Sequence, residues 1–229
     1  MIGFLGGTGP EGRGLALRFA LAGEEIMLGS RDLARAEEAV QRMKGRVPIA
    51  GVWAATNASV AQEADTVFVT VPYEAQPSLL EPLAASLVHK VVVSTVAPLA
   101  FDQGRATALP VPEGSVAAQT QRLLPESQVV AAFQNVSAVD LWVPDRPIEG
   151  DVVVCSDYEH PKEEVMALAQ RIPNLRAVDG GALANARYVE EITALLLNIN
   201  RIYKARTMIR IVGLESHQKD RQPSVDHLT

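Results

Sequence analysis

Short, continuously apolar segments alternate with helix-patterned segments over the first two thirds of the chain. Seven of these segments carry apolar residues at nearly every position, and not at every second one. They are residues 1–6, 25–30, 47–52, 65–71, 90–96, 128–133 and 151–156. Strands with this pattern are covered on both faces, which is typical of parallel sheets flanked by crossover helices. The pattern therefore predicts seven buried strands.

Residues 32–44 and 73–87 have the apolar spacing of helices and would supply two of the crossovers. The alternation predicts an α/β protein with a Rossmann-type parallel sheet and a smaller C-terminal α/β segment. We expect a nucleotide-binding domain in residues 1–150, a substrate and dimerisation segment in 151–213, and a flexible tail in 214–229. Residues 101–114 contain several Pro and Gly residues and are expected to form a loop.

The C-terminal segment is predicted to end in a long apolar helix, from residue 185 to about 211. Val189, Ile192, Leu195 and Ile199 follow one another at spacings of three and four, and residues around them are apolar nearly all round. Such a helix must be buried on several sides, within this subunit or against a second one.

Composition narrows the functional classes. The chain has 229 residues, a mass of 24.6 kDa, a net charge of −6 and a pI near 5.3, which argues against nucleic acid as the main partner. Its one cysteine excludes an internal disulfide, and no Cys/His cluster has the spacing of zinc ligands. No apolar run reaches the roughly 20 residues that span a bilayer. These features indicate a cytoplasmic protein without structural metal and without a membrane anchor.

A glycine-rich loop lies directly between the first predicted strand and the first predicted helix. It matches the pattern G-x-G-x-x-G with Gly7, Thr8, Gly9, Pro10, Glu11 and Gly12. In this context the glycines form the tight turn, admit a pyrophosphate to the backbone and let the helix approach the strand. The helix N-terminus adds N–H donors and a positive dipole end. The loop therefore predicts dinucleotide binding.

The end of the second strand indicates which dinucleotide. NAD-binding proteins usually carry an acidic residue there for the ribose 2′-hydroxyl. This chain has Ser30 and Arg31 at that point, with Arg35 one helical turn later. A hydroxyl and two guanidinium groups can bind a 2′-phosphate by charge-assisted hydrogen bonds, whereas a carboxylate would repel it. We therefore expect NADP(H).

The chemistry should occur at the carboxyl ends of the strands. The residues that follow three neighbouring predicted strands are Val71, Pro72 and Tyr73, then Ala97 and Pro98, then Gln134, Asn135 and Val136. None of the four histidines falls among them. Tyr73 and, on the late helix, Lys204 are the candidate proton donors, although packing for Tyr73 and solvation for Lys204 are the simpler explanations. The scarcity of acid–base groups at these strand ends favours hydride transfer between two rings, because that reaction needs stacking and orientation more than proton transfer.

Three stretches of the sequence are similar to a known family. The run GGTGPEGRGLALRFALAGEEIMLGSRD, the strand end TVPYEA and the late DGGALANARYVEEITALLLNINR resemble the NADPH-dependent reductases of coenzyme F420, a 5-deazaflavin. The similarity extends from residue 1 to about residue 214. It implies a small Rossmann protein, usually a homodimer, that passes a hydride between NADPH and carbon 5 of the deazaflavin.

The resemblance also implies roles for particular residues. By matching motif positions, Thr8, Ser30, Arg31 and Arg35 would hold the 2′-phosphate, and Pro10, Glu11 and Gly12 the pyrophosphate. Val71, Pro72 and Ala97 would line the nicotinamide side, and residues 132–138 would face the deazaflavin. Members of the family commonly have histidine where this chain has Gln134.

Two alternatives remain open on the residues alone. One is an NADPH-dependent reductase of another acceptor, such as a flavin, an imine or a small carbonyl compound, with Tyr73 or Lys204 as proton donor. The other is a non-catalytic NADP-sensing module that binds the coenzyme without oxidising it.

Overall fold

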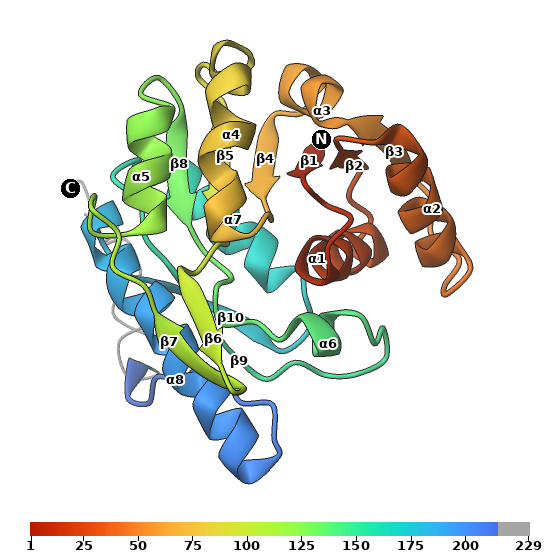
Figure 1. Cartoon of the computed structure of the whole chain (residues 1–229). Helices are drawn as coiled ribbons and strands as arrows, with labels where there is room; N and C mark the ends of the chain where they lie inside the picture. Colours follow the sequence, from red (N-terminus) through yellow and green to blue (C-terminus); the bar gives the residue numbers. More distant parts are fainter. Residues whose placement is uncertain (215–229) are drawn as a thin grey trace, which may run out of the picture.

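Six parallel strands form the main sheet, in the order β3-β2-β1-β4-β5-β8 (Figure 1). A computed structural model describes residues 1–214. The strands are β1 (Ile2–Leu5), β2 (Ile26–Ser30), β3 (Val52–Thr56), β4 (Thr66–Val69), β5 (Val91–Ser94) and β8 (Gln128–Ala131). Ile2 pairs with Ile26 on one side and with Thr66 on the other, so the strand order reverses between β1 and β4. This is the doubly wound Rossmann order, in which ligands bind beyond the carboxyl ends of the strands at the reversal. The predicted fold class is confirmed.

Helices cover both faces of the sheet, as the continuously apolar strands require. One face packs against α1 (Pro10–Leu21), α2 (Leu33–Lys44) and α7 (Glu159–Gln170). The other face packs against α3 (Asn57–Glu63), α4 (Gln76–Leu80) and α5 (Val116–Leu123). Phe4, Phe19, Phe68 and Phe133 lie at the centre of the first face, with neighbouring ring centroids 5.0–6.5 Å apart. These fully buried rings fix α1, and with it the glycine loop, against the sheet.

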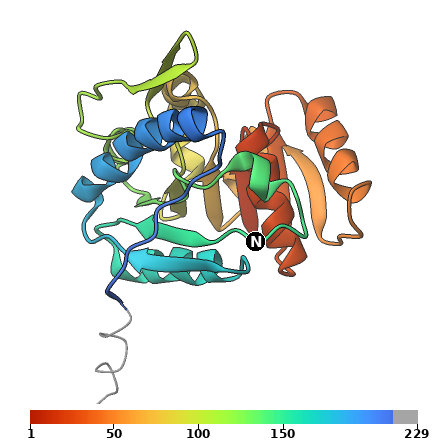
Figure 2. The ribbon, with the colours of Figure 1, turned by 90° about the horizontal axis from the view of Figure 1, so that it is seen from below.

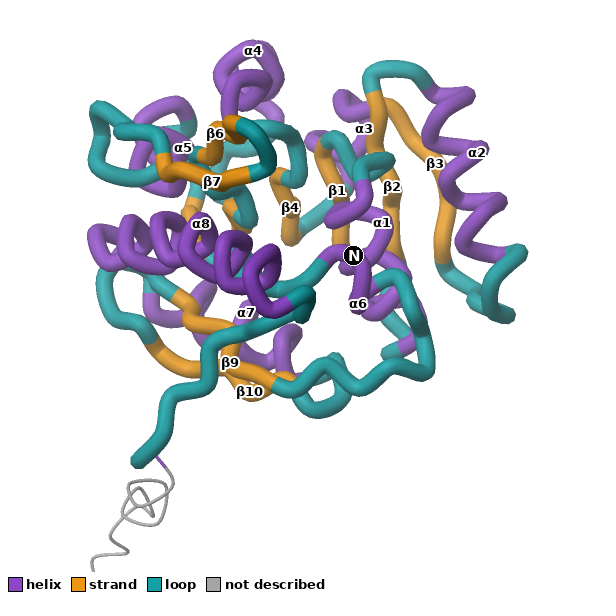
Figure 3. Tube along the Cα trace, turned by 60° about the horizontal axis from the view of Figure 1, so that its bottom comes forward, coloured by secondary structure: helices purple, strands orange, loops and turns teal. Residues whose placement is uncertain are grey.

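A smaller unit follows the sheet. Strands β9 (Gly150–Val154) and β10 (Leu175–Asp179) form a parallel pair, joined to β8 by a single antiparallel bridge between Ala131 and Cys155. A short helix, α6 (Ala138–Leu141), precedes them. Helix α8 (Ala186–Tyr203) runs between this strand pair and a hairpin on its other side (Figures 2 and 3). Cys155 is fully buried, as expected of a packing residue.

After α8 the chain returns across β9. Residues 205–211, which we call the C-terminal strap, are tied to that strand through Asp151. The Asp151 amide donates to the Ile209 carbonyl at 2.8 Å, and its carboxylate receives the Ile211 amide at 2.5 Å and a bidentate contact from Arg176. Arg176 and the backbone contacts hold the pKa of Asp151 below its ordinary value against the opposing effect of burial. The strap thereby closes the unit.

Two predicted elements in the first half were wrong. The strand expected at residues 47–52 is β3, which begins only at Val52; it is an edge strand whose burial varies along its length. The loop expected at residues 101–114 contains the hairpin β6 (Leu99–Asp102) and β7 (Arg105–Ala108). Its two-residue turn has positive φ at Gln103 and Gly104, which matches the right-handed twist of the strands. Asn198 of α8 anchors the hairpin through both backbone groups of Ala106.

Two predicted helices differ in extent. Residues 73–87 form η1 (Tyr73–Ala75), α4 and η2 (Glu81–Ser86), because Pro77 and Pro82 each interrupt the backbone hydrogen bonds and start a new short helix. The late helix, preceded by η3 (Leu183–Asn185), ends at Tyr203 and not near residue 211. Lys204 stops it in a left-handed conformation, φ 50°. The predicted tail, apart from Leu214, lies outside the described residues.

Candidate active site

The glycine loop connects the end of β1 to the start of α1. At three of its glycines, Gly6, Gly7 and Gly12, the backbone lies too close to neighbouring atoms for a side chain to fit. Gly6 has φ +66°, and its amide donates to the Asn57 side chain at 3.1 Å. A Cβ at Gly7 would lie 2.7 Å from atoms of Leu28 and Phe4, and one at Gly12 would lie 2.6 Å from the Thr70 hydroxyl. A Cβ at Gly9 would meet nothing nearer than 3.8 Å. Gly9 therefore faces open space where a pyrophosphate can approach, while Gly7 and Gly12 are needed for packing. The sequence pattern missed Gly6, which makes the turn.

A cavity of about 710 Å³ opens beside this loop, at the carboxyl ends of β1 to β4. Its volume lies in the range of small-molecule and cofactor sites. The lining residues are Gly6, Thr8, Gly9, Ser30, Arg31, Arg35, Thr56, Asn57, Ala58, Thr70, Val71, Pro72, Ala75, Ser78, Leu79, Pro82 and Leu83. Seven of the predicted site residues are among them, namely Thr8, Gly9, Ser30, Arg31, Arg35, Val71 and Pro72. The structure thus brings the loop, the end of β2 and the end of β4 together.

Two guanidinium groups at the cavity edge are available for an anion. Arg31 and Arg35 are exposed, and within residues 1–214 neither forms an ion pair with a carboxylate. The nearby Asp32 carboxylate instead caps α2, accepting the Ala34 amide at 3.0 Å. Ser30 accepts the Asp32 amide at 3.2 Å. The end of β2 therefore presents cationic side chains, while the Asp32 carboxylate is directed to the backbone of α2.

Several lining residues were missed from the sequence. Thr56 ends β3, and Asn57 and Ala58 begin α3; the sequence pattern misses all three because it predicts this strand at residues 47–52. Asn57 is buried and its side-chain oxygen holds the glycine loop. Thr70, at the end of β4, donates its hydroxyl to the Leu5 carbonyl at 3.1 Å. The sequence feature that could have identified Asn57 is an Asn at the first position of a helix that directly follows a strand.

Other predicted residues lie on neighbouring strand ends and do not line the cavity. Ala97 and Pro98 follow β5, and Gln134, Asn135 and Val136 follow β8. Gln134 is 6% exposed and donates to the Ser94 carbonyl at 3.1 Å, but its side-chain oxygen has no partner among the described residues. Asn135 is committed to α8, donating to Thr193 at 2.8 Å and to the Val189 carbonyl at 3.0 Å. This strand end therefore holds one unsatisfied buried acceptor.

Glu11 is the titratable group of the glycine loop. Burial raises the pKa of its carboxyl group to about 8, an effect partly opposed by a hydrogen bond with the Thr95 side chain. The group is thus mostly neutral at pH 7. A neutral carboxyl does not repel a pyrophosphate, whereas a carboxylate at this helix N-terminus would compete for the positive dipole end.

The candidate proton donors are not gathered at the cavity. Tyr73 is half-buried in η1, and Lys204 is exposed at the end of α8; neither lines the cavity. Among residues 1–214, no group of three His, Cys, Asp or Glu side chains could hold a metal ion, and no helix is long and apolar enough to cross a membrane.

The strand order, the glycine loop at the strand reversal and the cationic end of β2 define a dinucleotide-binding protein of the Rossmann class. Residues 1–98 match the family model described as NADP oxidoreductase, coenzyme F420-dependent. The chain is 42% identical to an F420-dependent NADP reductase of Methanocaldococcus jannaschii, over 93% of this chain and 99% of that protein. It is 39% identical to one of Methanothermobacter thermautotrophicus, over 95% and 97%.

A solved structure agrees with these relatives. The crystal structure of a candidate F420-dependent NADP reductase from Arthrobacter sp. FB24 matches with a TM-score of 0.79 and 28% identity, over 93% of this chain and 99% of that one. The chain belongs to the family of F420-dependent NADP reductases.

Proposed function

We propose that the protein transfers a hydride between NADPH and coenzyme F420 at the carboxyl edge of the main sheet. The observation that carries this proposal is the junction of an open glycine loop with a cationic strand end, in a chain of this family. Thr8, Ser30, Arg31 and Arg35 bind the 2′-phosphate, and the loop from Gly7 through Pro10 and Glu11 to Gly12 binds the pyrophosphate. Binding there directs the nicotinamide towards the ends of β4 and β5.

The chain's own residues supply orientation for this reaction. A C–H bond of the reduced nicotinamide breaks, the hydride forms a C–H bond at carbon 5 of the deazaflavin, and water supplies the accompanying proton. Val71, Pro72 and Ala97 present small apolar surfaces to the nicotinamide side and exclude water. Pro98, Gln134, Asn135 and Val136 form the deazaflavin side. The unpartnered oxygen of Gln134 can accept a hydrogen bond from a ring N–H there.

The test is anaerobic mixing of the protein with NADPH and oxidised F420, following the loss of deazaflavin absorbance. NADH in place of NADPH, and FMN in place of F420, are the controls. Rapid bleaching with NADPH and F420, and not with the controls, is the expected result. If NADPH is bound but neither F420 nor FMN is reduced, the chain is an NADP-sensing module and the proposal is wrong.

We also propose a cytoplasmic homodimer that pairs through α8. Tyr188, Leu195 and Ile202 lie seven residues apart, on one face of the helix, and are 63%, 55% and 71% exposed. An apolar stripe of this kind indicates a protein contact surface. The single reduced, buried Cys155 supports the cytoplasmic location.

Light scattering on Leu195→Glu tests the pairing. A wild-type dimer and a monomeric Leu195→Glu are expected. Leu21→Glu is the control, since Leu21 is a 44% exposed leucine at the end of α1 and should leave the dimer intact. A monomeric wild type would contradict the proposal.

A further inference from the structure

A second, smaller cavity adjoins the main one. It has a volume of about 160 Å³, lies between α1 and α2, and shares Thr8 and Arg35 with the larger cavity. Its lining residues are Thr8, Arg13, Arg35, Glu38, Ala39 and Arg42. The two cavities therefore meet at two of the four side chains that the family resemblance assigns to the 2′-phosphate.

The charges of this smaller cavity suit a dianion. Arg42 donates to the Glu38 carboxylate at 2.5 Å, which neutralises the one acid in the lining. Arg13 and Arg35 remain, and within the described residues no carboxylate pairs with either. A phosphate monoester carries about −1.5 to −2 charges near pH 7. Two guanidinium groups without a carboxylate partner, which line this cavity together with Thr8, match that charge.

Two contacts hold the guanidinium group of Arg13. Its Nε donates to the Gly9 carbonyl at 3.4 Å, which ties it to the glycine loop. Its guanidinium carbon lies 5.1 Å from the centroid of the Trp142 ring, within the range of a cation–π contact. Arg46 lies over the same ring at 5.4 Å but does not line the cavity. Trp142 thus fixes the direction of Arg13.

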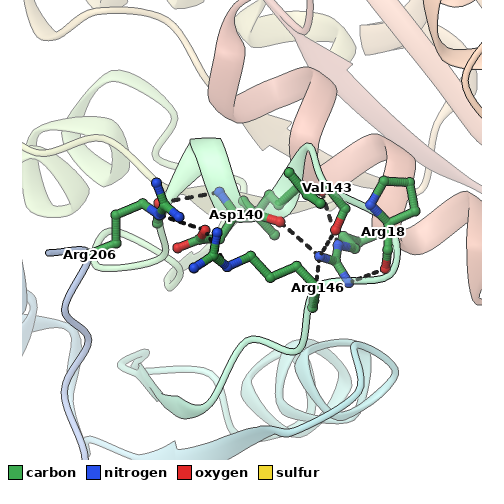
Figure 4. A network of polar contacts seen from close by, with 8 residues as sticks. Arg18, Asp140, Val143, Arg146 and Arg206 are labelled. Carbon is green, nitrogen blue, oxygen red and sulfur yellow. Dashed lines mark hydrogen bonds and ion pairs between the residues drawn. The ribbon is translucent and has the colours of Figure 1, made fainter.

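The backbone on both sides of Trp142 is held from α1. The buried Arg18 donates to the carbonyl of Leu141, the last residue of α6, at 2.9 Å and to that of Val143, in the loop that follows, at 2.5 Å. Figure 4 shows Arg18 beside Asp140, Val143 and Arg146. Arg18 makes further contacts with the carbonyls of Asp140, Pro144 and Arg146. Arg146 and Arg206 pair with the Asp140 carboxylate at 3.0 and 2.8 Å. This loop, which we call the Arg18 loop (residues 140–146), is therefore fixed in register against the glycine-loop helix.

We propose that Arg13, braced by Trp142, is a further ligand of the coenzyme 2′-phosphate and contributes to the preference for NADP over NAD. Arg13 lies on α1, opposite the Arg35 that α2 contributes, so the phosphate is held from two helices. Trp142 is a positioning residue: it does not touch the phosphate and acts by orienting Arg13. The inference rests on the proposed NADP site and assigns residues to it that the sequence motif does not contain.

Calorimetric titration with two nucleotides tests this assignment. Adenosine 2′,5′-bisphosphate and 5′-AMP differ only by the 2′-phosphate, so the ratio of their affinities isolates the subsite. Arg13→Gln is expected to weaken bisphosphate binding about tenfold, as loss of one charge-assisted contact does, with 5′-AMP unaffected. Arg46→Gln is the matched control, because it removes the other cation at Trp142 without altering the cavity lining, and should leave the ratio unchanged.

Two tryptophan variants separate positioning from general structure. Trp142→Phe keeps an aromatic face and should retain most of the preference, whereas Trp142→Leu should lose about threefold of it. Equal weakening of both nucleotides by Trp142→Leu would overturn the positioning role.

An unchanged affinity ratio in Arg13→Gln would overturn the assignment of Arg13. If the wild-type protein prefers the bisphosphate, Arg13→Gln loses that preference and no F420 is reduced, the proposed hydride transfer fails while the assignment of Arg13 stands.

Discussion

The carboxylate of Glu190, in α8, accepts the backbone amide of Val116 at 2.7 Å and so caps helix α5 from outside. Its second oxygen accepts the Ala117 amide at 3.0 Å, and the residue is only 1% exposed. Both oxygens thus satisfy amides that the helix itself leaves unpaired. One side chain joins the sheet-covering helix α5 to the helix that carries the proposed contact surface.

Glu190→Ala should strongly destabilise the protein. It leaves two buried N–H groups without an acceptor, at a cost of about 1–3 kcal/mol each. Urea denaturation should show a loss of about 2–4 kcal/mol in the free energy of unfolding. Glu191→Ala, at the exposed neighbouring position, should change it little. Equal stability of the two variants would show that Glu190 does not cap α5.

The same residue should make stability pH-dependent. Burial raises the pKa of Glu190 to about 7, from an ordinary value of 4.5 in the unfolded chain. Between these pH values the folded protein retains a proton that the unfolded chain has lost, so stability decreases as pH rises across this window. Glu190→Gln cannot ionise and should flatten that decrease. Denaturation of both proteins at pH 5, 6 and 7 measures the difference, and parallel curves would refute it.

Coenzyme binding should weaken above pH 8 because of Glu11. Its carboxyl group, with a pKa of about 8, is neutral below that pH and becomes negative above it, beside the proposed pyrophosphate position. The dissociation constant of NADP⁺ should then rise with each pH unit above 8, approaching tenfold per unit if only the neutral form binds. Glu11→Gln should remove the dependence. A wild-type constant that is flat from pH 7 to 9 would exclude this linkage.

Arg35→Gln should reduce selectivity between the coenzymes. Arg35 lines both cavities and lacks a carboxylate partner among the described residues. Removing it should raise KM for NADPH about 10- to 100-fold and leave KM for NADH nearly unchanged. Steady-state kinetics with both coenzymes give the ratio. Arg105→Gln, an exposed arginine on β7, is the control for charge alone.

Tyr73→Phe should retain kcat to within about twofold if the hydride passes directly between two rings. Tyr73 lies outside the cavity lining, and ring-to-ring transfer needs no protein proton donor. F420 reduction followed by stopped flow measures it. A loss of about 100-fold or more would instead indicate general acid catalysis and favour the carbonyl or imine reductase alternative.

The central strands and the glycine loop were predictable from the sequence because one physical rule governs each. Strands covered on both faces need apolar residues throughout, and a backbone that approaches a phosphate needs glycine. The edge strand β3 is not covered along its whole length, so the first rule does not locate it. Because the apolar run at residues 47–52 predicts this strand too early, Asn57 and the residues around it are missed. The hairpin turn at Gln103 and Gly104 has a recognisable Gly, but its strands are short and Ala106 is their only buried residue.

The contact between Arg13 and Trp142 could not be predicted from the sequence pattern, because the two residues are far apart in the chain. Arg13 and Trp142 are 129 positions apart, and their contact depends on how Arg18 holds residues 140–146 against α1. A buried arginine that satisfies five carbonyls leaves no periodic signal, because its partners are backbone groups of any residue type.

The C-terminal strap also bears on how the protein avoids aggregation through an open strand edge. Strand β9 has β10 on one side, and an uncovered edge on the other side would offer free N–H and C=O groups to any passing strand. Ile209 and Ile211 occupy backbone and side-chain groups of Asp151 on β9. A chain truncated after Lys204 should therefore still form the nucleotide site. It should also aggregate, because the free edge of β9 could pair with strands of other molecules.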